Sequence, residues 1–130
     1  MPMTFAPSKT PNGHPILRMV SSGEVTAADA DNLTRSVTPG GPWENLPLLA
    51  IVEAGASFSA EARQAFTRSN DDKTKKRMPV AVVVTSAPLR VMLSFVVRMS
   101  GAAGHTRFVS SEAEALSFLD EKLAERPAPA

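Results

Sequence analysis

The candidate side chains for chemistry in this 130-residue chain are two histidines, His14 and His105, and two serines, Ser57 and Ser59. His14 and His105 lie far apart, and neither has the neighbouring carboxylates or third ligand that a metal site or an acid–base pair requires. The chain contains no cysteine, which excludes disulfides, thiolate catalysis and cysteine-based zinc sites. We therefore expect no enzyme activity, no catalytic residue, no metal ion and no cofactor.

Ser57 and Ser59 are the candidate acceptors of a phosphate group. They precede a segment with helical periodicity from Ala60 to about Ser69, and a helix N-terminus stabilises added negative charge. A serine in this place is also a good N-cap, because its hydroxyl accepts a hydrogen bond from a backbone N–H of the first turn. We predict that Ser59 is a cap, with phosphorylation of Ser57 or Ser59 as the alternative.

The charge of the chain indicates which partners to expect. Fourteen basic and thirteen acidic residues give a net charge of +1, so no bulk field draws the chain to nucleic acid. A basic run over residues 73–77 has no interleaved aromatics, which is typical of a solvated loop. No apolar stretch reaches the ~20 residues of a membrane span, and the first residues lack the pattern of a secretory signal. We expect a cytoplasmic protein that does not bind nucleic acid and does not cross a membrane.

Two unbroken aliphatic runs, Leu48–Val52 and Val80–Val84, indicate the fold class. Five strand formers without polar alternation are typical of strands covered on both faces. Further strands are predicted over 16–20 and 106–109, and helices over 26–37, 60–69, 86–100 and 111–123. Thr26 and Ser111 are predicted caps, Ser111 as part of a capping box with Glu114. This alternation predicts a single α/β domain over 15–126, with a flexible leader over 1–14 and a flexible tail over 127–130.

The order of these elements resembles the STAS domain, and its SpoIIAA-like branch most closely. The resemblance rests on four stretches: Ser22–Thr26, Phe58–Arg63, Val80–Val83 and Arg107–Ala115. It implies a mixed four- to five-stranded sheet with helices packed mainly on one face, and regulatory protein binding or small-ligand sensing without catalysis. Members of the wider family switch partners when a serine in an Asp-Ser-Ser-Gly-like sequence is phosphorylated. The matching loop here, residues 55–60, lacks the acidic residue and the glycine of that pattern.

The predicted helix over 88–100 has more apolar surface than one face of a sheet would cover. Its apolar side chains span ~240° of the helix, where about 100° is ordinary for such a helix. Arg90, Ser94 and Arg98 form its one polar stripe and are predicted to face solvent, with Val91 and Val97 partly exposed at the flanks. This surplus apolar surface is either buried under neighbouring elements or forms an interface.

The candidate interface consists of six residues, five of them on this helix: Arg90, Val91, Phe95, Val97, Arg98 and Trp43. Trp43 is the only tryptophan, and it either packs over the sheet edge or anchors a partner. These observations favour a non-enzymatic regulatory or protein-interaction module, whose partner is another protein or a second copy in a weak homodimer. The alternative is a carrier that holds a lipid or another small apolar molecule against the helix over 88–100.

Overall fold

A five-stranded mixed sheet forms the centre of the molecule. The computed structural model describes residues 3–37, 46–69, 79–99 and 106–124. The strand order is β1 (Met3–Lys9), β2 (Pro15–Ser21), β4 (Leu48–Val52), β6 (Val80–Val84) and β7 (Thr106–Val109). β1 is antiparallel to β2, and the four strands from β2 to β7 are parallel. The predicted α/β class with a mixed sheet is therefore confirmed, and the two aliphatic runs are neighbouring inner strands.

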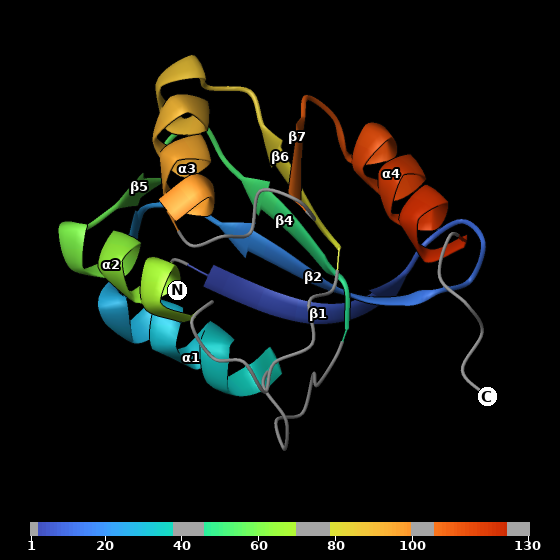
Figure 1. Cartoon of the computed structure of the whole chain (residues 1–130), viewed down its shortest axis with the longest axis horizontal. Helices are drawn as coiled ribbons and strands as arrows, with labels where there is room; N and C mark the ends of the chain where they lie inside the picture. The colour runs from blue at the N-terminus through green and yellow to red at the C-terminus, as the bar shows by residue number, and fades with distance from the viewer. Residues whose placement is uncertain (1–2, 38–45, 70–78, 100–105, 125–130) are drawn as a thin grey trace.

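Three helices cover one face of this sheet and the fourth covers the other (Figure 1). The parallel strands are joined by α1 (Ala27–Val37), α2 (Ala60–Ser69) and α3 (Ala87–Met99). Each of these crossovers steps in the same direction along the sheet, and right-handed crossovers that step in one direction place their helices on one face. α4 (Glu112–Ala124) follows the last strand and returns over the opposite face.

The alternation of side chains along the strands divides the core into two layers. Under α1, α2 and α3, strand residues such as Leu17, Met19 and Val52 pack with Val25 and Leu33. Under α4, the residues one position away along the strands pack with the helix; this layer consists of Ile16, Leu49, Ala81, Val83, Val109, Ala115, Phe118 and Leu119. Both faces of β4 and β6 are thus covered, which accounts for their unbroken aliphatic sequences.

The prediction of a flexible leader over residues 1–14 is wrong for the part that the structure describes. Met3–Lys9 form β1, which pairs along its whole length with β2, and the Met3 side chain is buried. The hairpin turn is closed by a hydrogen bond from the Thr10 N–H to the His14 carbonyl at 2.9 Å, and Gly13 takes the positive φ that the turn requires. Pro7 is tolerated because β1 is an edge strand.

A second, short sheet that the sequence did not indicate joins the segment before α1 to the loop before α2. β3 (Glu24–Val25) pairs in parallel with β5 (Ser57–Phe58) beyond the ends of β2 and β4. The Ser57 N–H donates to the Gly23 carbonyl at 2.8 Å, and the Ser59 N–H donates to the Val25 carbonyl at 3.0 Å. These bonds attach the start of α2 to the segment that leads into α1. The predicted tail over 127–130 and the basic run over 73–77 lie outside the described residues.

Candidate interaction surface

α3 is an apolar helix that is poorly covered by the rest of the molecule. Its thirteen residues include only two charged ones, Arg90 and Arg98. Yet among its described side chains only Val96 is buried, whereas Leu89 and Leu93 are half-buried against the core layer of α1 to α3. A hydrophobic helix in a folded domain ordinarily buries most of its apolar surface. The fold therefore leaves part of the apolar surface of α3 in contact with solvent.

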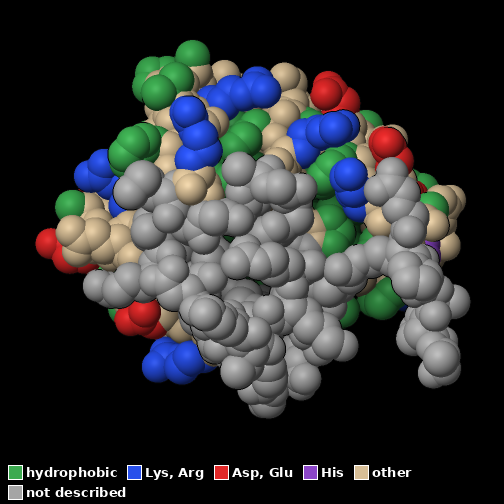
Figure 2. All heavy atoms as spheres, in the orientation of Figure 1, with side chains coloured by type: hydrophobic (Ala, Val, Ile, Leu, Met, Phe, Trp, Pro, Cys, Tyr) green, Lys and Arg blue, Asp and Glu red, His purple; other side chains and the backbone are tan. Residues whose placement is uncertain are grey.

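Val91 and Phe95 form the exposed part of this surface, here called the α3 ridge. Their relative exposures are 70% and 61%, and they are the two exposed large hydrophobic residues among those that the structure describes. Being four residues apart, they stand one helical turn above each other on the same side of α3. Ala87 and Pro88 are also exposed at the N-terminal end. Figure 2 shows hydrophobic side chains gathered over α3 at the upper left, with basic side chains beside them.

The two arginines of α3 flank this ridge, and both are exposed. The guanidinium of Arg90 donates a hydrogen bond to the backbone carbonyl of Phe108 in β7 at 3.3 Å, which turns that side of the helix toward the sheet edge. Arg98 lies two turns further along. α3 carries no acidic residue, so the charges that this helix itself places beside the ridge are all positive.

The orientation of α3 differs in part from the sequence-based prediction. Arg90 and Arg98 face solvent as predicted, and Val97 is half-buried at one flank, but Ser94 is half-buried as well. The centre of the exposed side is Val91 instead of Ser94, a rotation of about 60° at ~100° per residue. The cause is that Leu89, Leu93 and Val96 turn toward the core while Arg90 leans onto β7.

Ser59 is the N-cap of α2, as predicted. Its Oγ accepts a hydrogen bond from the Ala62 N–H at 3.0 Å, and its carbonyl accepts from the Arg63 N–H at 3.1 Å, which begins the helix. Ser57 is exposed on β5. The predicted cap of α4 also forms, since Ser111 Oγ accepts from the Glu114 N–H at 3.2 Å. At the start of α1 the Thr26 carbonyl accepts from the Ala30 N–H at 3.1 Å, but the Thr26 hydroxyl donates to the Asp29 carboxylate at 3.0 Å, which also accepts from the Thr26 backbone N–H at 2.9 Å.

The remaining sequence candidates do not converge on a site. Trp43 and His105 lie outside the described residues. His14 belongs to the β1–β2 turn, where its backbone N–H donates to Thr10 Oγ1 at 3.1 Å. No three histidine, aspartate or glutamate side chains gather in a metal-binding arrangement within the described ranges. None of the helices in the described ranges combines the length and hydropathy that crossing a membrane would need.

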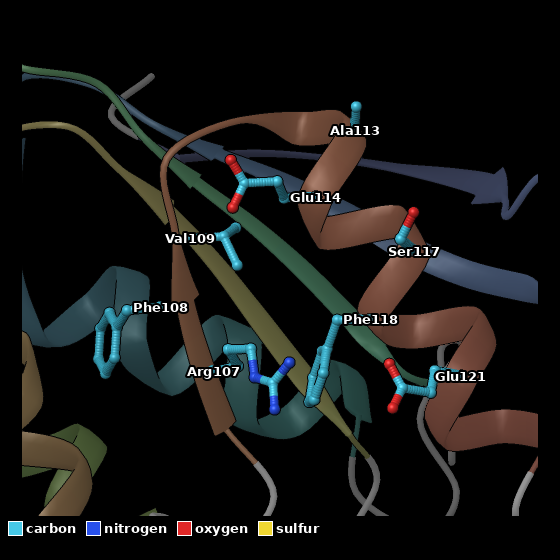
Figure 3. A pocket seen from close by; sticks show the side chains of 8 residues that line it. All are labelled: Arg107, Phe108, Val109, Ala113, Glu114, Ser117, Phe118 and Glu121. Carbon is cyan, nitrogen blue, oxygen red and sulfur yellow. The ribbon is translucent and has the colours of Figure 1, made fainter.

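The structure also contains a groove that the sequence did not indicate. It lies between β7 and α4, has a volume of about 470 Å³, and is wide open to solvent. Arg107 and Phe118 point toward one another across it (Figure 3), with the guanidinium carbon 4.7 Å from the ring centroid. Two exposed carboxylates, Glu114 and Glu121, line its helix side. Phe118 lines this groove and is also buried in the core layer under α4.

Comparison with known proteins bears on the fold. No protein-family model matches the chain, and no curated protein matches it. The chain is similar in structure to an uncharacterized protein of the DUF3478 family with a SpoIIAA-like fold from Shewanella loihica PV-4, with a TM-score of 0.63 and 15% sequence identity. The similarity covers 90% of this chain and 93% of the other. Such a likeness at low identity concerns architecture, and it confirms the resemblance drawn from the order of elements: the chain has a SpoIIAA-like, STAS-type fold.

Proposed function

We propose that this protein is a non-enzymatic interaction module that binds a partner through the α3 ridge. The observation that carries the proposal is the exposure of Val91 and Phe95 on one side of a helix whose Leu89 and Leu93 pack against the core. Exposed hydrophobic residues that lie together, beside charged ones, are typical of binding surfaces. Aromatic side chains such as Phe95 are frequent anchors of such surfaces.

The size of the ridge favours a reversible contact. Burying a Val or Phe side chain completely contributes about 1.5–3 kcal/mol, so covering the exposed parts of Val91 and Phe95 contributes about 3 kcal/mol together. This is less than the 4.1 kcal/mol of a millimolar complex, before the entropic cost of association. The ridge alone therefore does not support an obligate interface, and a partner must make further contacts around it.

The carrier alternative places a lipid or a small apolar molecule against α3. The groove between β7 and α4 gives it no support, because no residue that lines this groove belongs to α3 and two of them are exposed carboxylates. Native mass spectrometry without detergent distinguishes the two functions. Co-purified lipid would favour the carrier, and a bare chain would favour the interaction module.

A photo-cross-linking amino acid at position 95 tests the proposed function in cells. In the matched control the same photo-cross-linking amino acid replaces Ala113, which is exposed on α4 on the opposite face of the sheet. We expect a discrete protein adduct from position 95 that is absent from position 113 and is lost when Val91→Asp is added. The same adducts from both positions, or none that depends on Val91, would contradict the proposal. Because Val91 is exposed, Val91→Asp should leave the far-UV circular dichroism spectrum unchanged.

A further inference from the structure

From the charges around the α3 ridge we infer the chemistry of the partner: a short, acidic amphipathic helix of another protein. This inference rests on the proposed function and specifies what binds there. Two features of α3 carry it. The ridge offers two apolar side chains one turn apart, and the helix carries Arg90 and Arg98 with no carboxylate of its own.

The dimensions of the surface fit a helical partner. Val91 and Phe95 are separated by about 6 Å along the axis of α3, and Arg90 and Arg98 by about 12 Å, at 1.5 Å per residue. A partner helix presents apolar anchors at i, i+3, i+4 and i+7, which follow the same spacing. Glutamates seven or eight positions apart on its flank would span the distance between the two guanidiniums, and arginine recognises carboxylates with paired N–H groups. The hydrogen bond from Arg90 to the Phe108 carbonyl uses one of five N–H donors and leaves the others for such a contact.

A second copy of this chain fits the surface less well. Two α3 helices packed on each other about a two-fold axis would contribute four arginines and no carboxylate to one interface. Like charges placed across an interface oppose association, and they do so most where water is excluded. The charge pattern of α3 thus favours a partner of opposite sign over the predicted homodimer.

An anionic membrane surface is also a poorer match. Basic segments that hold proteins to anionic lipids generally carry clusters of four to eight Lys or Arg residues, whereas α3 contributes two. Helices that lie in the membrane interface insert a broad apolar face between basic residues. In α3 the leucines Leu89 and Leu93 turn toward the core, which leaves Val91 and Phe95 as the exposed large apolar residues of the helix.

The test measures binding of the full chain to two dye-labelled synthetic helices by fluorescence anisotropy. Both carry leucines at i, i+3, i+4 and i+7; one has glutamates and the other lysines at the flanking positions. We expect the glutamate helix to bind ~10-fold more tightly, since complementary charge selects the partner, and we expect its affinity to fall with added salt. Arg98→Gln should weaken its binding several-fold. Lys9→Gln, which removes an exposed cation from β1, should leave the dissociation constant unchanged.

Four results would overturn the inference. Equal or tighter binding of the lysine helix would refute the charge assignment, while the cross-linking at position 95 would still decide the proposed function. Binding to phosphatidylcholine–phosphatidylglycerol vesicles that depends on Phe95, with no binding of the glutamate helix, would assign the ridge to a membrane. A dimer in sedimentation equilibrium that Val91→Asp dissociates would assign it to a second copy. If neither helix binds the chain, the partner is not an acidic amphipathic helix.

Discussion

Replacing Phe95 by alanine should cost the folded protein little, although the same change in a buried phenylalanine is among the most damaging substitutions known. Phe95 is 61% exposed, so folding removes only about two-fifths of its surface from water. Complete burial of a phenylalanine contributes at most about 3 kcal/mol by transfer, which gives about 1 kcal/mol for this fraction. Alanine is a better helix former by about 0.5 kcal/mol, which offsets part of the loss. We expect Phe95→Ala to lower the free energy of unfolding by about 0.5 kcal/mol.

The matched control is Phe118→Ala, the same substitution at a helical residue that is 4% exposed. Its ring lies in the core layer under α4 and under the guanidinium of Arg107. Its loss should cost about 3–5 kcal/mol, because a cavity is left behind. Equilibrium unfolding in urea measures both values, and an unchanged slope would show that the two variants unfold like the parent chain. A cost above about 2 kcal/mol for Phe95→Ala would refute the orientation assigned to α3 and with it the ridge.

The remaining predictions concern stability and can be measured in the same urea experiments. Ser59→Ala should cost about 1 kcal/mol through the lost N-cap of α2, whereas Ser57→Ala on exposed β5 should change nothing; equal effects of both would refute the cap. Ser21 is fully buried, and its hydroxyl has no hydrogen-bond partner within the described residues, so Ser21→Ala should be neutral or stabilise by about 1 kcal/mol; a clear loss of stability would mean that the hydroxyl is satisfied. Arg18 and Glu112 form an ion pair at 3.1 Å with both side chains more than a third exposed, so Glu112→Gln should cost at most about 0.5 kcal/mol, and less at high salt. An effect that grows with salt would contradict this assignment.

The parts of the fold that follow from local sequence are those whose residues carry their own signals. The aliphatic runs of β4 and β6 indicate strands covered on both faces wherever they lie in the sheet. Ser59 and Ser111 indicate helix starts because the hydroxyl of each satisfies a backbone N–H within its own turn. These features needed no knowledge of tertiary contacts.

The missed parts depend on partners distant in sequence. β1 contains Pro7 and little alternation, and it is a strand because the edge of β2 offers its backbone hydrogen bonds. The rotation of α3 depends on the packing of Leu89 and Leu93 against the core and on the contact of Arg90 with the Phe108 carbonyl, eighteen residues away. The apolar sequence of α3 therefore indicated surplus apolar surface without showing which side chains carry it. Of the candidate interface, Val91 and Phe95 are exposed, Val97 is half-buried, and Trp43 lies outside the described residues.

Hydroxyl-radical footprinting at Phe95, read by mass spectrometry, tests most directly the claim that the α3 ridge is a binding surface. Phe118 serves as the internal reference, since it has the same chemistry and is buried. In the purified chain Phe95 should be oxidised several-fold faster than Phe118, in keeping with its exposure. In cells that contain the partner, oxidation of Phe95 should fall toward that of Phe118, because the ridge is then covered. Equal oxidation of Phe95 in the purified chain and in cells would contradict the claim.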